Sequence, residues 1–138
     1  IFAPHLHPKE MLALGVFEGK MINDCMDEFP HAWFSEALTK NKLSPLNPDV
    51  NCNLYQIKSR QSLHEWKSKK WIIGSDDRGW FQWFCRYALG RRDPEIDTKQ
   101  MKRWASIARW YGTLKKDPTR TIIRQTLLQW SWPHEDFL

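Results

Sequence analysis

The chain has 138 residues, of which 27% are charged and 14% aromatic, and nine of the aromatic residues are tryptophans. This length suits one domain with a substantial core. No apolar run approaches the roughly 18 residues of a membrane-spanning helix, so we expect no membrane partner. The three cysteines are an odd number at wide spacing, which argues against a disulfide scaffold. Residues 1–15 lack the continuous apolar region of a signal peptide, so we expect an intracellular protein in a reducing compartment, nuclear or cytoplasmic.

Positive charge is concentrated in the second part of the chain. Residues 1–50 carry four lysines, no arginine and seven acids, for a net charge of −3. Residues 51–138 carry seventeen lysines and arginines against nine acids, for a net charge of +8. A basic region of this kind indicates an anionic partner such as nucleic acid.

Helix signals begin near the N-terminus. Pro8 suits a first helical position and predicts a short helix over 8–14 that ends near Gly15. A second helix is predicted over 30–38, and its expected buried side chains are Trp33, Phe34 and Leu38. Prolines and asparagines in 41–53 predict a long loop, and residues 54–57 suit a short strand. A third helix is predicted over 62–70, with Ser62 as its N-cap, Leu63 and Trp66 inward, and Lys67, Lys69 and Lys70 exposed.

The most informative segment is an aromatic helix expected over about 76–89. Ser75 or Asp76 suits its N-cap, and Gly90 suits the left-handed position after its last turn. Its side chains are apolar nearly all round except for Gln82 and Arg86, which predicts a central and not a peripheral helix. We expect a partly buried Arg86 to form a structural ion pair.

The remaining sequence predicts two further helices. Asp97 and Gln100 have capping-box spacing before a long helix that reaches about Lys116. One face of this helix carries cations that alternate with hydroxyls, namely Lys102, Ser106, Arg109, Thr113 and Lys116. The opposite face is expected to place in the core Met101, Trp104, Ala108, Tyr111 and Leu114. A last helix is predicted from Asp117-Pro118 to about Ser131, with a polar side formed by Arg120, Arg124 and Ser131 and an apolar side formed by Ile123, Leu127 and Trp130.

These elements together predict an all-α fold. We expect a compact bundle of five or six helices around the central aromatic helix, in a single tryptophan-rich domain over 1–138.

The cationic face of the long helix suggests the function. Cations and hydroxyls both donate to phosphate oxygens, and a tryptophan at the edge of such a face can stack on a base. The sequence therefore predicts a non-enzymatic domain that binds DNA or RNA. The expected contact residues are Arg78, Arg91, Arg92, Lys102, Arg103, Arg109, Trp110, Lys116, Arg120 and Arg124. An ordinary solvated helix face is the competing interpretation of the same pattern.

Two other functions remain open from the sequence. Asp76 or Asp77, with Gln82 near an aromatic pocket, suits an enzyme that acts on nucleic acid or its bases, although helix capping also explains both acids. A protein-interaction module for an acidic partner is the third hypothesis. His5, His7, Cys25 and His31 match no zinc-ligand spacing, and no phosphate-binding glycine loop occurs, so we expect no metal and no cofactor.

A set of short strings also resembles a family of short proteins found in varied eukaryotes and viruses. The strings lie at residues 8–12, 14–17, 28–30, 33–34, 77–87, 90–92, 102–104, 124–125 and 127–128 and at Trp130, with a DxRGWFQWxCRYxxGRR-like motif as their centre. The resemblance spans nearly the whole chain. It implies a self-contained domain and transfers no activity and no catalytic residue.

Overall fold

The structure is a computed structural model that describes residues 1–59 and 74–138, and it is helical in both ranges. The described α-helices are α1 (Pro8–Leu14), α2 (Ala32–Thr39), α4 (Trp80–Ala88), α5 (Pro94–Ser106), α6 (Ala108–Lys116) and α7 (Thr121–Gln129). Three 3₁₀ turns accompany them: η1 (Phe17–Gly19), η2 (Asn23–Glu28) and η3 (Val50–Cys52). The predicted all-α fold is confirmed. The helix predicted over 62–70, with its three lysines, lies outside the described residues.

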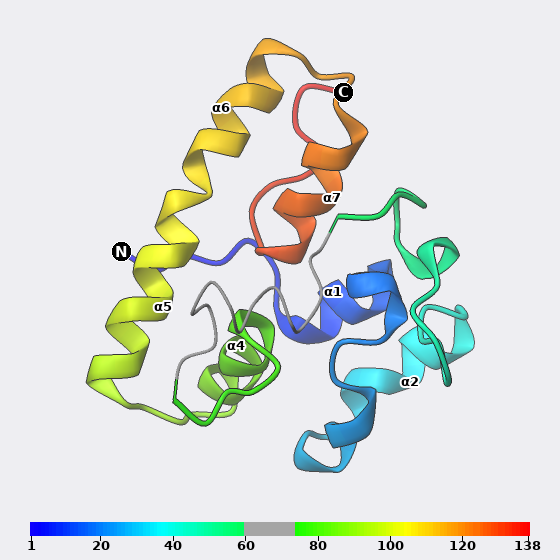
Figure 1. The fold of residues 1–138 in the computed structure, drawn as a ribbon, viewed down its shortest axis with the longest axis vertical. Helices are drawn as coiled ribbons and strands as arrows, with labels where there is room; N and C mark the ends of the chain where they lie inside the picture. The colour runs from blue at the N-terminus through cyan, green and yellow to red at the C-terminus, as the bar shows by residue number, and fades with distance from the viewer. Residues whose placement is uncertain (60–73) are drawn as a thin grey trace.

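Figure 1 shows how these helices are arranged. The helices α5 and α6 follow one another along one edge of the molecule, and α7 turns back beside α6. The helices α1 and α2 pack together on the other side. The N-terminal segment is held to the chain after α7, because His5 N donates to Ser131 O over 2.7 Å and Leu6 N donates to Ser131 Oγ over 2.7 Å. None of the helices in the two described ranges combines the length and apolar character that a membrane crossing demands.

The aromatic helix α4 lies in the core, as its composition predicts. Every residue from Trp80 to Cys85 is buried, and the Trp83 side chain is 0% exposed. The Trp83 indole is placed in the interior by a hydrogen bond, since its Nε1 donates to Asp97 Oδ1 over 2.8 Å. Phe2 packs across the same aromatic cluster, with ring centres 5.4 Å from Trp83 and 5.1 Å from Trp104.

The helix boundaries differ from the predicted ones in four places. The helix α4 begins at Trp80 after Gly79 and not near residue 76. The N-cap of α5 is Asp93, whose side chain accepts from Ile96 N, whereas Asp97 is buried under Trp83. The predicted long helix is divided at Ile107, which is buried in place of the exposed Ala108. The last helix begins at Thr121 and ends at Gln129. Asp117 Oδ1 accepts from Thr119 N over 3.3 Å, so Asp117-Pro118 forms a turn that precedes the last helix.

Two predictions for the N-terminal part are also wrong. Leu38 is 49% exposed, and the smaller Ala37 occupies the buried position between α2 and α1. Residues 54–57 form a turn and no strand. Leu54 N donates to Gly15 O over 3.1 Å and Tyr55 N donates to Gln125 Oε1 over 3.1 Å, so these backbone groups are satisfied without a sheet.

Gly15 permits this close approach of the loop to the end of α1. Its φ is +111°, and a Cβ at this position would lie 2.1 Å from Cys52 O. Gly112 on α6 is the opposite case, because nothing lies within 4 Å of its Cβ position.

We therefore expect opposite effects of the same substitution at these two glycines. Gly15→Ala should lower the free energy of unfolding by about 3 kcal/mol, because it combines a backbone clash with a strained φ. Gly112→Ala should raise it by about 0.8 kcal/mol through better helix propensity. Urea titrations followed by circular dichroism measure both. Equal effects at the two positions would contradict the described packing around Gly15.

The start of α1 predicts a pH dependence of stability. His7 Nδ1 accepts from Lys9 N over 3.0 Å, and Glu10 Oε1 accepts from His7 N over 3.0 Å. Burial lowers the pKa of His7 and outweighs the opposing effect of Glu10. The pKa of His134 is also lowered, chiefly by burial. Both imidazoles thus stabilise the fold above their ordinary pKa of about 6.5, and this contribution is lost as the pH falls through the folded-state pKa.

We expect the urea midpoint to fall between pH 7 and pH 5, and to fall less in His7→Asn. Asparagine retains an N-cap acceptor but does not titrate in this range. His134 should account for part of the dependence that remains. If the urea midpoint of His7→Asn falls with pH as steeply as that of the unaltered protein, the His7 cap makes no contribution to the pH dependence.

Candidate nucleic-acid interface

A hollow of about 880 Å³ lies between α5–α6 and α7. The start of α4, the η1 turn and the chain at 58–59 also line it, and it is open to solvent. We call it the basic hollow, and its described lining residues are Phe17, Lys58, Ser59, Gly79, Trp80, Arg103, Ser106, Ile107, Arg109, Trp110, Arg120, Ile122, Ile123, Thr126, Gln129 and Trp130.

The lining combines cations with aromatic rings. Its cationic residues are Lys58, Arg103, Arg109 and Arg120, and no carboxylate occurs among the lining residues that the structure describes. Phe17 and three tryptophans supply the aromatic surface. Such a mixture suits a ligand that is both anionic and planar, since charges bind phosphates and indole rings bind base faces.

The turn between α5 and α6 places two of these residues. Arg109 and Trp110 lie in the first turn of α6, and the Arg109 guanidinium lies 5.0 Å from the Trp110 ring centre. Arg109 is exposed, whereas Trp110 is half-buried against the cluster formed by Ile107, Leu114, Ile123 and Leu127. The Trp110 ring is therefore held by packing while the adjacent charge remains in solvent.

Arg103 and Arg120 approach the hollow from its two walls. The Arg103 guanidinium lies 5.4 Å from the Trp130 ring centre, and its Nη1 donates to Gln100 Oε1 over 3.2 Å. Burial lowers the pKa of Arg103 to about 10. Arg120 is exposed at the N-cap of α7, whose first turn has no side-chain cap. Both the charge and the helix dipole at this position favour an anion.

The floor of the hollow rests on a strained turn. Phe17 and Glu18 have φ values of 54° and 56°, which non-glycine residues rarely adopt. Gln129 stabilises the turn, because its Oε1 accepts from Phe17 N over 3.0 Å and its Nε2 donates to Ser59 O over 2.6 Å. Backbone strain of this kind is concentrated at functional sites, where surrounding contacts enforce it.

The structure brings together part of the predicted contact set. Arg103, Arg109, Trp110 and Arg120 all line the basic hollow. Lys102 and Lys116 are exposed on α5 and α6 but lie outside the lining. The predicted hydroxyl donors are engaged within the helices, because Ser106 Oγ donates to Arg103 O over 2.6 Å and Thr113 Oγ1 donates to Arg109 O over 3.0 Å.

Sequence reasoning missed several lining residues. Lys58 and Ser59 follow the predicted strand and gave no local signal. Trp130 is predicted on the apolar side of the last helix, but it is only half-buried, and its ring centre lies 4.7 Å from that of Trp80 in the lining. No local pattern in the sequence marks these residues as parts of one site.

The prediction that Arg124 lies on an exposed basic face is wrong. Arg124 is only 4% exposed. Its Nη1 donates to His134 O and Asp136 O, each over 2.8 Å, and its Nη2 donates to Pro118 O over 2.8 Å. Arg124 therefore fixes the C-terminal segment to the turn before α7. Ser131, predicted on the same face, is also buried.

Three further predicted contact residues lie outside the lining. Arg91 is turned toward Asp76, with Nη1–Oδ1 and Nη2–Oδ2 distances of 2.9 and 2.7 Å. Arg92 packs on Tyr87, with 3.5 Å between its guanidinium and the ring centre, and Nη1 donates to Tyr87 O over 2.7 Å. Arg78 is half-buried before α4, where its backbone N donates to Gln82 Oε1 over 3.0 Å.

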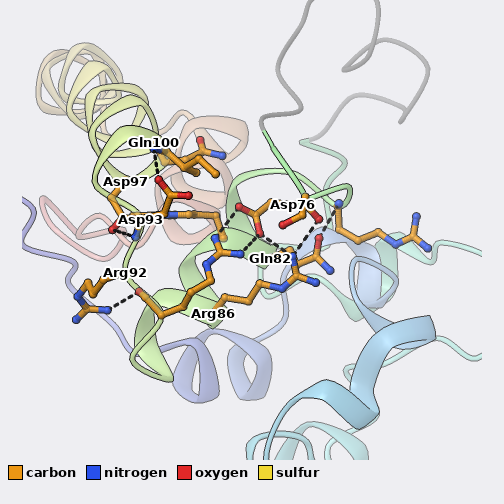
Figure 2. A network of polar contacts seen from close by, with 12 residues as sticks. Asp76, Gln82, Arg86, Arg92, Asp93, Asp97 and Gln100 are labelled. Carbon is orange, nitrogen blue, oxygen red and sulfur yellow. Dashed lines mark hydrogen bonds and ion pairs between the residues drawn. The ribbon is translucent and has the colours of Figure 1, made fainter.

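Asp76 is the centre of an ion-pair network and not a helix cap (Figure 2). It is 0% exposed, and its Oδ1 also accepts from Arg86 Nη1 over 2.8 Å. Glu28 binds the other side of the Arg86 guanidinium, with 2.7 Å between Nη2 and Oε1. These hydrogen bonds, first to Glu28 and then to Asp76, raise the pKa of Arg86. The predicted structural ion pair of Arg86 is confirmed.

The part of the chain that the structure describes contains neither a metal site nor a carboxylate at the hollow. No three histidine, cysteine or acidic side chains gather there as a metal site requires. Asp77 is exposed, and neither Asp76 nor Asp77 belongs to the described lining of the hollow.

Comparisons of the chain with protein-family models, curated proteins and solved structures found no match. The resemblance of the aromatic motif to a family of short proteins therefore stays a prediction.

The two adjacent aspartates provide a matched test of the network. Asp76→Asn should lower the free energy of unfolding by about 3 kcal/mol, because it removes the buried charge that neutralises two arginines. Asp77→Asn should change it by less than about 0.5 kcal/mol, since the side chain is exposed. Chemical denaturation measures both. Similar values for the two variants would exclude a structural role for the Asp76 ion pairs.

Proposed function

We propose that this chain is a non-enzymatic nucleic-acid-binding domain that holds its ligand at the basic hollow. The observation that carries the proposal is the meeting of exposed cations and tryptophan rings around one hollow. Lys58, Arg109 and Arg120 are exposed there and form no ion pair within the described residues. Their charges are therefore available to phosphates.

The aromatic surface favours nucleic acid over an acidic protein. Aspartate and glutamate side chains of a protein partner would satisfy the cations but have no extended planar face. Nucleic-acid bases do have such a face, and stacking on an aromatic side chain contributes about 1–3 kcal/mol per base. Trp110 and Trp130 are both half-buried beside the cations, so one ligand can use both kinds of contact.

No observation favours the enzymatic alternative. Both carboxylate oxygens of Asp76 accept hydrogen bonds from arginines, and Gln82 Oε1 accepts from Arg78 N. A general base must reach the proton it removes. The described lining of the hollow contains no carboxylate in that position. The proposal therefore assigns binding and no reaction.

The salt dependence of binding tests the proposal. If Lys58, Arg109 and Arg120 each neutralise one phosphate, the affinity for a single strand should fall about 20-fold between 50 and 200 mM salt. Fluorescence anisotropy with labelled single- and double-stranded DNA and RNA measures it. Binding that is absent for every ligand, or unaffected by salt, would refute the proposal.

A charge reversal at the hollow provides the matched variant. Arg109→Glu should weaken binding at least tenfold and leave the unfolding midpoint nearly unchanged, because the side chain is exposed. Lys40→Glu is the control, since it makes the same charge change at the exposed C-cap of α2, across the molecule from α6 (Figure 1), where it removes only an exposed ion pair with Glu36. Equal loss of affinity in both variants would show that only net charge matters.

A further inference from the structure

We propose that the basic hollow selects single-stranded nucleic acid by taking one unpaired base against Trp110 and Trp130. This inference rests on the proposed function and specifies its ligand. The phosphates on either side of that base follow the exposed cations of α5 and α6. The recognised chemistry is the face of an unpaired base together with its backbone phosphates, which DNA and RNA strands share.

The size and lining of the hollow admit a base. A volume of about 880 Å³ lies in the upper part of the usual range of pockets for small organic ligands, roughly 300–1,000 Å³, so a base and its sugar can enter. In a duplex the base faces are covered by their neighbours, and only base edges are open in the grooves. A base of a duplex enters such a pocket only after unstacking and unpairing, which costs a few kcal/mol. An unpaired strand avoids most of that cost.

The rings are arranged to receive a base without moving the core. Trp110 and Trp130 both pack against the cluster of Ile107, Leu114, Ile123 and Leu127, and both remain half-buried at the hollow. The Trp80 ring centre lies 4.7 Å from that of Trp130, and Trp80 is almost completely buried. Trp110 and Trp130 therefore keep part of their surface open at the hollow, and Trp130 also packs against the buried Trp80 indole. Rings that are already fixed lose little entropy when a base stacks on them.

The cations continue beyond the hollow in a regular series. Lys102, Arg109 and Lys116 are exposed and recur every seven residues. Arg109 and Lys116 lie on one side of α6, about 10.5 Å apart along its axis, and Lys102 lies on α5, which precedes α6 along the same edge of the molecule (Figure 1). At 1.5 Å per residue the series therefore spans at most about 21 Å. Stacked nucleotides advance roughly 3.4 Å each, so this span corresponds to about six nucleotides. Arg109, the middle charge, also lines the hollow, so the base would enter near the centre of the bound strand.

Fluorescence anisotropy with the unaltered protein tests whether the preferred ligand is single-stranded or paired. The probes are U and dT strands of two, four, six and eight nucleotides, and blunt-ended DNA and RNA duplexes of eight G·C-rich base pairs, which have no unpaired base and carry twice as many phosphates as the longest strand. We expect affinity to rise with length up to about six nucleotides. The eight-nucleotide strands should bind at least tenfold more tightly than the duplexes, although the duplexes carry more charge. Comparison of U with dT shows whether the 2′-hydroxyl contributes.

The stacking residue is tested by variants with different readouts. Trp110→Ala should weaken strand binding about tenfold, while the slope of log affinity against log salt stays the same, because stacking releases no counterions. Trp110→Phe should remain within about threefold of the unaltered chain. Arg109→Gln should lower the slope itself, by about 0.7. These three patterns separate base stacking from charge.

A photo-crosslink keeps the test independent of whether Trp110→Ala folds. Strands with one central 5-bromouracil are irradiated with the unaltered chain, and the modified peptide is identified by mass spectrometry. The expected site is Trp110 or Trp130. A crosslink confined to other regions, or a blunt-ended duplex bound as tightly as the strand, overturns the inference but leaves the proposed function standing. Failure of every nucleic acid to bind overturns both.

Discussion

The fold depends on the burial of α4, and that burial depends on how the charges around this helix are neutralised. An almost wholly apolar helix is favoured in the core, but Arg86 lies on it and Arg91 follows it. Asp76, which is fully buried, binds both guanidinium groups, and Glu28 binds the outer side of Arg86. Without these carboxylates the two half-buried guanidinium groups would lose their partners, which would destabilise the fold. The network therefore permits the aromatic helix to occupy the centre, and it also fastens the η2 turn to that helix.

The partners of the arginines decide where free positive charge remains. Two groups among the described arginines differ in this respect. Arg86, Arg91 and Arg124 bind carboxylates or backbone carbonyls within the fold, and so contribute to stability. Arg109 and Arg120 are exposed at the basic hollow and form no ion pair within the described residues. A count of cations along the sequence overestimates the binding surface, because it adds these two groups together.

Residue spacing and composition predicted the features of the fold that depend mainly on the local sequence. The turn of helix after Pro8, the central place of the aromatic helix, its Arg86 ion pair and the exposed row on α5–α6 all follow from spacing and composition. Asp76 and Asp77 show the limit. Both suit a helix cap equally well in the sequence, yet one is buried by arginines ten and fifteen residues away and the other is exposed. Arg124 likewise has helical spacing on a polar face, but the C-terminal carbonyls that bury it are set by tertiary structure alone.

The basic hollow could not be predicted from the sequence, because tertiary contacts alone form it. These same contacts determine how rigid its lining is when a ligand binds. Its floor joins segments more than a hundred residues apart through Gln129, which binds both Phe17 N and Ser59 O. Gln125 extends the connection, since its Nε2 donates to Gly15 O and to Gln129 Oε1 over 3.1 and 3.0 Å. A buried polar network whose members satisfy one another is rigid and specifies one arrangement. The strained turn at Phe17 is thus fixed before any ligand arrives, and the ligand does not have to order this part of the lining. Because the floor is already rigid, we expect the flexibility of the strand, and not that of the protein, to account for most of the entropy lost on binding.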